Sequence, residues 1–120
     1  MEMEVAEFFS GAPDALAIHQ AVEAAILHIG PAAVRVSKSQ VGFYRKRPFA
    51  ATWKPMQYLS GEHPPLVLSV YLQRRDGSPR WKEIIEPTEG RFTHHLELRS
   101  GRDVDDFVRS RLQEAWRHAA

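Results

Sequence analysis

The stretch Leu66-Val67-Leu68-Ser69-Val70-Tyr71-Leu72 is the strongest β-strand signal in the chain, and the rest of the sequence is best interpreted around it. Prolines precede it and a glycine-containing turn follows it. Because successive side chains of a strand point to opposite faces, Leu68 and Val70 are expected on one face of a sheet. Ser69 and Tyr71 then lie on the other. The sequence therefore predicts a sheet with one packed face.

Amphipathic helices are predicted before and after a group of short strands. Residues 13–29 form the first helix, because apolar side chains recur every three or four residues until Gly30-Pro31 ends it. The last helix follows the capping sequence Ser100-x-x-Asp103. The other predicted elements are strands at Val34–Val36, Val41–Tyr44, Phe49–Trp53 and Phe92–Leu98, and a short helix at Pro79–Ile85 with Ser78 as its N-cap.

Strands grouped between two helices, without regular strand–helix alternation, favour an antiparallel sheet covered on one face. The predicted fold class is therefore α+β, a two-layer arrangement of a mainly antiparallel sheet with an N-terminal and a C-terminal helix packed on one face. A chain of 120 residues is expected to form a single domain over residues 1–120. The residues expected on the open face are Gln40, Gly42, Tyr44, Ser69, Tyr71, Thr93 and His95.

The composition excludes several classes of site. The chain has no cysteine, so it holds no disulfide, thiolate nucleophile or cysteine-ligated zinc. Its net charge is +1, so any attraction to nucleic acid must come from the distribution of charge and not from its total. An acidic N-terminus and the lack of an apolar run of about 20 residues favour a cytoplasmic protein without a membrane partner.

Positive charge is concentrated in one interval of the chain. No Asp or Glu occurs between Glu23 and Glu62, and the predicted hairpin tip Arg45-Lys46-Arg47 lies within it. Phosphate-pairing charge beside stackable rings is typical of sheet-based single-strand binders. The alternative is that the charges only prevent edge pairing, while Phe49 and Trp53 complete the core. An exposed tip contributes little packing, so replacing its three basic residues is expected to leave the melting temperature nearly unchanged.

Two adjacent histidines have different expected roles. His94 is in register with apolar residues, which predicts a neutral core histidine bonded to a backbone or hydroxyl partner. His95 faces the other way, and with Ser39 it could form the base and nucleophile of a small hydrolase. Ser39 lacks the glycines of a nucleophile elbow, and no acid is clearly placed to orient the histidine. An enzyme is therefore less favoured than a binding domain.

No cofactor and no metal site is predicted. The seven glycines are isolated, and no phosphate-binding loop pattern occurs. Adjacent strand residues such as His94 and His95 point to opposite faces and cannot easily share one ion. His19 and Glu23 are one helical turn apart and could chelate a metal weakly, but a solvated helix face is the ordinary explanation of such a pair.

Two stretches of the chain resemble an uncharacterised bacterial family, domain of unknown function 5655. They are Val36-Ser37-Lys38-Ser39-Gln40-Val41-Gly42-Phe43-Tyr44-Arg45-Lys46-Arg47 and Arg91-Phe92-Thr93-His94-His95-Leu96-Glu97-Leu98-Arg99. The plan of a helix followed by strands is more distantly similar to domain-of-unknown-function family 1801. The first resemblance implies a small α+β domain, found alone or next to predicted nuclease-like domains, with no established activity.

The favoured function is a non-catalytic binding domain for an anionic partner, nucleic acid first, that uses the basic hairpin and the open sheet face. The alternative is a protein-interaction or homodimerisation module that covers the open sheet with another chain. A small hydrolase using Ser39 and His95 is the third possibility. The residues predicted to bind are Lys38, Ser39, Tyr44, Arg45, Lys46, Arg47, Lys54, Tyr71 and His95.

Overall fold

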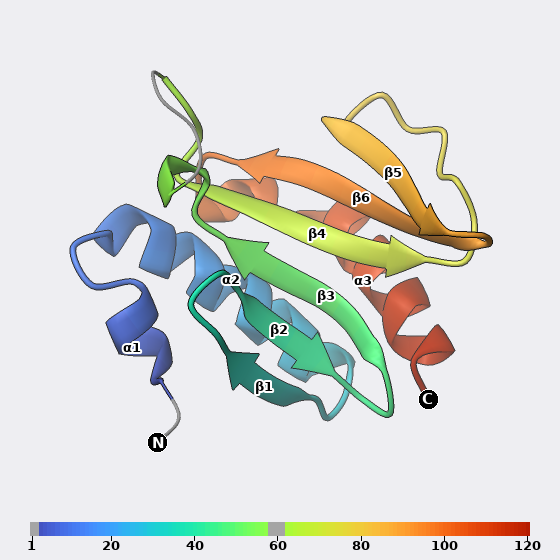
Figure 1. Ribbon diagram of the computed structural model, residues 1–120, viewed down its shortest axis with the longest axis horizontal. Helices are drawn as coiled ribbons and strands as arrows, with labels where there is room; N and C mark the ends of the chain where they lie inside the picture. The colour runs from blue at the N-terminus through green and yellow to red at the C-terminus, as the bar shows by residue number, and fades with distance from the viewer. Residues whose placement is uncertain (1–2, 58–61) are drawn as a thin grey trace.

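The computed structural model describes residues 3–57 and 62–120. Figure 1 shows a twisted sheet in front of two long helices, with a short helix at its side. The helices are α1 (Val5–Phe8), α2 (Pro13–Ile29) and α3 (Asp106–His118), with 3-10 turns η1 (Pro55–Gln57) and η2 (Gly101–Asp103). The strands are β1 (Ala33–Val36), β2 (Val41–Tyr44), β3 (Pro48–Trp53), β4 (Leu66–Leu72), β5 (Glu83–Thr88) and β6 (Arg91–Leu98).

These six strands form one antiparallel sheet in the order β1-β2-β3-β4-β6-β5. The strand with the strongest sequence signal, β4, lies inside the sheet between β3 and β6. Helices α2 and α3 lie behind the sheet in Figure 1, and their buried side chains share one core with the strands. The predicted α+β class, with both helices on one face of the sheet, is confirmed.

The pairing of the strands confirms which face is open. Leu68 pairs with Leu96, and both side chains belong to the core beneath the helices. Ser69 pairs with His95 at the next position, so these two side chains point to the opposite face. The face predicted to be open from alternation is therefore the face away from α2 and α3.

The predicted short helix at Pro79–Ile85 is wrong. Residues Glu83–Thr88 form the edge strand β5, which pairs with β6. Ile84 packs against the core while its neighbours are exposed. Pro87 is tolerated because an edge strand need not use every backbone N–H in the ladder. Pairing with a distant strand thus outweighs the local preference of this segment for a helix.

The last helix begins later than its capping sequence suggested. Ser100 and Asp103 do form a reciprocal capping box, but it opens η2. Helix α3 begins at Asp106. Asp105 is its N-cap, and the Asp105 carboxylate accepts a hydrogen bond of 3.1 Å from the backbone N–H of Val108. The sequence also did not predict α1, whose Phe8 side chain is buried.

Two histidines lie in the core. The backbone N–H of Asp76 donates to His94 Nε2 at 2.9 Å, so Nδ1 carries the proton and donates to the Phe92 carbonyl at 3.2 Å. Burial lowers the pKa of His94 against the opposing effect of the Phe92 carbonyl, which keeps the ring neutral. The predicted core histidine with backbone partners is confirmed.

His19 is only 1% exposed, so its assignment to a solvated helix face is wrong. Its Nδ1 lies 2.8 Å from the Thr52 hydroxyl and its Nε2 lies 3.2 Å from a Glu23 carboxylate oxygen. Burial lowers the pKa of His19, and the nearby Glu23 carboxylate only partly offsets that effect. The hydrogen bond between His19 and Thr52 therefore links α2 to β3 inside the molecule.

Candidate functional site

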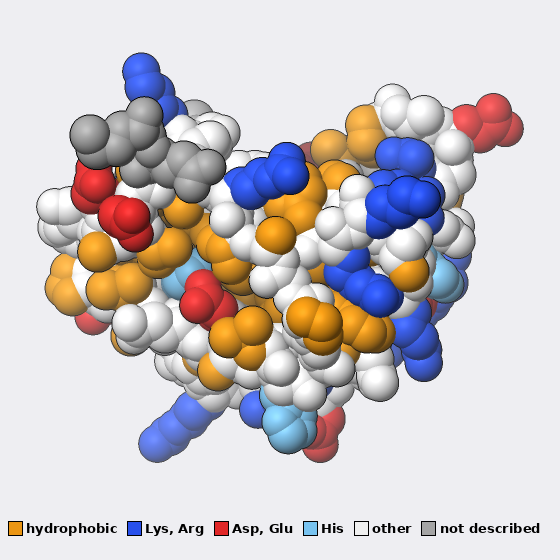
Figure 2. Space-filling view, turned by 90° about the horizontal axis from the view of Figure 1, so that it is seen from below, with side chains coloured by type: hydrophobic (Ala, Val, Ile, Leu, Met, Phe, Trp, Pro, Cys, Tyr) orange, Lys and Arg blue, Asp and Glu red, His pale blue; other side chains and the backbone are white. Residues whose placement is uncertain are grey.

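A cavity of about 640 Å³ lies on the open face of the sheet. It continues around one end of the sheet to the last turn of α3, where His118 and Ala119 line it. Figure 2 shows Lys and Arg side chains gathered toward the right-hand end of the molecule, where Figure 1 places the β2–β3 turn and the end of α3. The cavity is also lined by polar and aromatic side chains of the sheet and its loops, which include Ser39, Gln40, Arg47, Trp53, Ser69, Tyr71, Arg91, Thr93 and His95.

A chain of hydrogen bonds crosses three strands at the floor of this cavity. Trp53 Nε1 on β3 donates to the Ser69 hydroxyl on β4 at 3.0 Å, and that hydroxyl lies 2.8 Å from His95 Nδ1 on β6. The rings of Trp53 and His95 meet edge to face, with centroids 5.8 Å apart. The side chains of Trp53, Ser69 and His95, one from each of three adjacent strands, are therefore held in one fixed arrangement.

His95 is neutral near pH 7. Burial lowers its pKa below the ordinary histidine value, and the Glu83 carboxylate on the neighbouring strand opposes this effect without reversing it. A neutral imidazole has one N–H donor and one acceptor nitrogen. His95 therefore presents a polar ring to the cavity without adding positive charge.

Two tyrosines lie on the same face, Tyr44 on β2 and Tyr71 on β4. Burial raises the pKa of Tyr71; a hydrogen bond with Gln40 opposes the rise and the nearby Tyr44 adds to it. Gly42 leaves room for Tyr44, because a Cβ at position 42 would lie 2.8 Å from Tyr44 Cε1. The Arg35 guanidinium covers the Tyr44 ring at 4.6 Å from its centroid. The open face thus offers half-buried rings for stacking.

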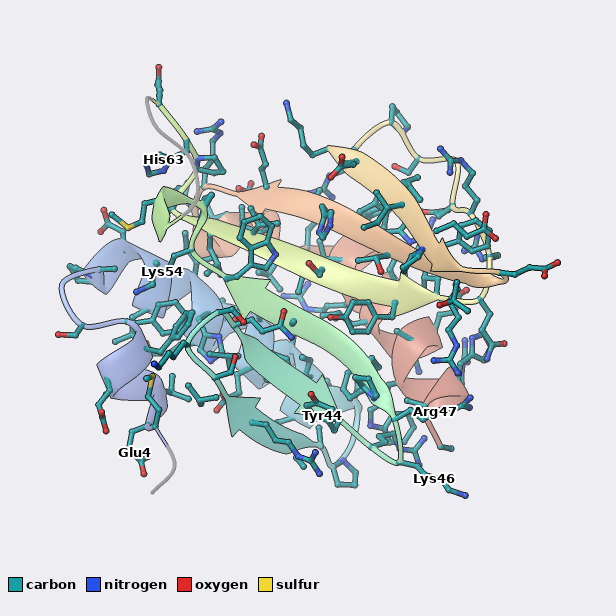
Figure 3. The ribbon with its side chains drawn as sticks, in the orientation of Figure 1. Glu4, Tyr44, Lys46, Arg47, Lys54 and His63 are labelled. Carbon is teal, nitrogen blue, oxygen red and sulfur yellow. The ribbon has the colours of Figure 1, made fainter. Side chains whose placement is uncertain are left out.

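The basic hairpin tip is partly used by the fold itself. The Arg45 guanidinium lies 3.7 Å from the centroid of the Trp116 ring and donates to the Trp116 carbonyl at 3.0 Å. Arg47 donates to the His118 carbonyl at 2.6 Å. The expectation that an exposed tip contributes little packing is therefore wrong for Arg45 and Arg47. In Figure 3 the Lys46 side chain, by contrast, points away from the molecule.

The remaining predicted binding residues are divided between the cavity and other parts of the molecule. Lys54 donates to the Phe8 carbonyl and lies over the Phe8 ring, so it fastens α1 and faces away from the cavity residues described above. Figure 3 shows Lys54 at the α1 end of the molecule, far from Arg47. Lys38 is exposed in the β1–β2 loop. Ser39, in the same loop, lines the cavity with Tyr71 and His95.

Ser39 and His95, the predicted hydrolytic pair, line the same cavity but are not hydrogen-bonded to each other. His95 Nδ1 is bonded to Ser69, whereas the Ser39 hydroxyl lies 3.2 Å from that of Ser37. Ser69 is only 2% exposed and already accepts a hydrogen bond from Trp53. The arrangement can orient the His95 ring, and hydrolysis by Ser39 and His95 stays a prediction.

Sequence reasoning did not select Trp53, Ser69 and Arg91 as site residues. Ser69 was placed on the correct face by alternation, but its role depends on the register of β3, β4 and β6. Trp53 was assigned to the core under one interpretation, although it follows the inward-facing Thr52 and so points outward. Counting alternation from Thr52 could have found it.

The described ranges 3–57 and 62–120 contain no cluster of three His, Asp or Glu side chains that could hold a metal ion. No helix within these ranges is long and apolar enough to cross a membrane.

Comparison with protein families identifies the family of this chain. No curated protein and no solved structure matches the chain. A family model matches residues 5–119, nearly the whole chain, and its description is domain of unknown function. This protein therefore belongs to the family of domain of unknown function 5655 (DUF5655).

Proposed function

We propose that this domain binds single-stranded nucleic acid, without catalysis, on the open face of its sheet. The observation that carries the proposal is the cavity of about 640 Å³ with Trp53, Tyr71 and His95 on its floor and Arg47 and Arg91 among its lining residues. Rings supply surfaces for unpaired bases, and guanidinium groups pair with phosphates. A single strand combines these two chemical features in one ligand.

The size of the cavity supports a ligand of one or two nucleotides. Binding pockets for small molecules are about 300–1,000 Å³, so a base and its sugar fit within this volume. Stacking of a base on an aromatic side chain contributes about 1–3 kcal/mol and depends little on the identity of the base. The floor of the site therefore favours unpaired bases over a duplex, whose bases are already stacked on each other.

The basic residues divide into phosphate contacts and structural contacts. Lys46 and Arg91 are exposed, and their side chains have no hydrogen bond or ion pair within the described residues. Arg47 lines the cavity while one of its nitrogens holds the end of α3. We therefore assign phosphate contacts to Lys46, Arg47 and Arg91, and structural roles to Arg45 and Lys54.

A polarisation titration with a labelled single-stranded oligonucleotide tests the proposal. Three phosphate contacts on a single strand give a salt slope of about −2.1, so raising salt from ~50 to ~200 mM weakens binding roughly twentyfold. Lys46→Gln is expected to reduce the slope by about 0.7, and Tyr71→Leu to weaken binding at both salts. Lys82→Gln is the matched control, because this exposed lysine lines a different hollow with Arg80 and Glu97, whereas Lys46 adjoins the cavity-lining Arg47.

Two results count against the proposal. One is the absence of binding to any single strand at ~50 mM salt. The other is a dimer by sedimentation whose formation is abolished by Tyr71→Leu, because the open sheet is then covered by a second chain. Intrinsic fluorescence gives an independent readout, since Trp53 lies at the cavity floor and a stacked base is expected to quench it.

A further inference from the structure

The orientation of the Ser69 hydroxyl determines which nitrogen of His95 carries the proton. Trp53 Nε1–H can only donate, so Ser69 accepts from it and keeps its own hydrogen for another partner. Ser69 is 2% exposed, and within the described residues the acceptor available for its own hydrogen is His95 Nδ1 at 2.8 Å, so we assign Ser69 as the donor of this bond. A neutral His95 that accepts at Nδ1 carries its proton at Nε2.

The Nε2 atom of His95 is accessible and has no partner in the protein within the described residues. No buried side-chain nitrogen or oxygen in these residues lacks a hydrogen-bond partner, so an unpartnered Nε2 is not buried, and His95 lines the cavity. The cavity has a fixed donor at this point, held in position by two further side chains.

A hydrogen-bond acceptor lies next to this donor. Glu83 on β5 is the direct cross-strand partner of His95, and directly paired side chains have Cβ atoms about 4.5–5.5 Å apart. Its carboxylate is close enough to influence His95 electrostatically. Within the described residues, Glu83 is exposed and makes no ion pair. Its two oxygens can therefore accept hydrogen bonds from a ligand.

We propose that the open face selects guanine among the bases of a single strand, with Glu83 and His95 as the residues that determine this specificity. The inference rests on the proposed function. Guanine O6 accepts from His95 Nε2–H, while guanine N1–H and the 2-amino group donate to the two Glu83 oxygens. Adenine, cytosine and thymine each have only one donor group on this edge, next to an acceptor, so they form two hydrogen bonds with His95 and Glu83 in place of three. Trp53, edge to face with His95, supplies the neighbouring ring surface.

Heptamers with three thymines on each side of a variable central base test this preference. Guanine at the centre is expected to bind about tenfold more tightly than adenine or cytosine, as one added hydrogen bond to a charged acceptor predicts. Inosine lacks only the 2-amino group and is expected to bind like adenine. Glu83→Gln is expected to remove the preference for guanine over inosine, whereas Glu89→Gln, at the exposed β5–β6 turn, leaves it unchanged.

The outcomes separate this inference from the function on which it rests. If no heptamer binds, both are wrong. If all four heptamers bind equally to the wild-type protein and Tyr71→Leu weakens every one, single-strand binding stands and guanine selection is wrong. A preference for guanine that persists in Glu83→Gln also overturns the assignment. The inosine comparison uses the wild-type protein alone, so it stays decisive even if Glu83→Gln lowers the melting temperature.

Discussion

Replacing Arg45 by methionine tests whether the β2–β3 turn holds the end of α3. Methionine keeps an apolar stem against the Trp116 ring, but it removes the cation–π contact at 3.7 Å and the hydrogen bond of 3.0 Å to the Trp116 carbonyl. A hydrogen bond from a charged group contributes roughly 1.5 kcal/mol, and a partly exposed cation–π contact about 0.5 kcal/mol. The free energy of unfolding should therefore fall by about 2 kcal/mol.

The expected change in melting temperature follows from the size of the chain. Unfolding entropy is about 2.1 cal/mol/K per residue, which for 120 residues gives about 0.25 kcal/mol/K. A loss of about 2 kcal/mol then lowers the melting temperature by roughly 8 °C. Lys46→Met is the matched control, because this exposed side chain points away from the molecule and its loss should shift the melting temperature by less than about 2 °C.

Thermal unfolding followed by circular dichroism distinguishes the two variants. If Arg45→Met melts within about 2 °C of the wild-type protein, as the control should, then Arg45 does not anchor α3. Arg45 would then be an exposed charge of the hairpin tip like Lys46, with no role in stability.

Three further results are expected. Gly30→Ala should destabilise the protein by about 1–3 kcal/mol in urea unfolding, because the added Cβ would lie 2.3 Å from Trp116 Cζ2; unchanged stability would contradict the packing described. Burial lowers the pKa values of His19 and His94, so below pH 6.5 the unfolded chain binds protons that the native state excludes. The free energy of unfolding should therefore fall from pH 7.5 to pH 5.5, by up to about 1.4 kcal/mol per pH unit for each histidine, and a flat profile would refute this. Tyr44 lies near Tyr71 on the open face, outside the cavity lining. Gly42→Ala should displace its ring and weaken single-strand binding about fivefold with little change in melting temperature; equal affinity would show that Tyr44 does not contact the strand.

The layers of the fold could be predicted from local sequence pattern. Strands β2 and β4 and helix α2 begin and end at the predicted residues, because each is a run of one clear periodicity with proline, glycine or polar residues at its ends. β5 could not be predicted in this way. Its residues gain their strand conformation from pairing with β6, and nothing within Glu83–Thr88 records that partner.

The candidate site likewise contains features that local sequence pattern predicts and features that depend on contacts between distant segments. Alternation was sufficient to place Tyr71 and His95 on one open face, since it depends on each strand alone. The bond from Ser69 to His95 depends on the register between strands, and the contact of Arg45 with Trp116 joins residues 71 positions apart. Such contacts are set by the assembled fold, so composition near the hairpin tip could not distinguish a phosphate contact from a helix anchor.

The last turn of α3 lines the cavity, and this has a practical consequence for handling the protein. His118 and Ala119 stand at the cavity wall, and Figure 1 places the C-terminal end beside the β2–β3 turn and away from the N-terminal end. A polyhistidine tag fused after Ala120 would begin one residue beyond the cavity-lining Ala119 and would bring its own imidazoles close to the proposed binding site. Affinity measurements should use an N-terminal or cleaved tag.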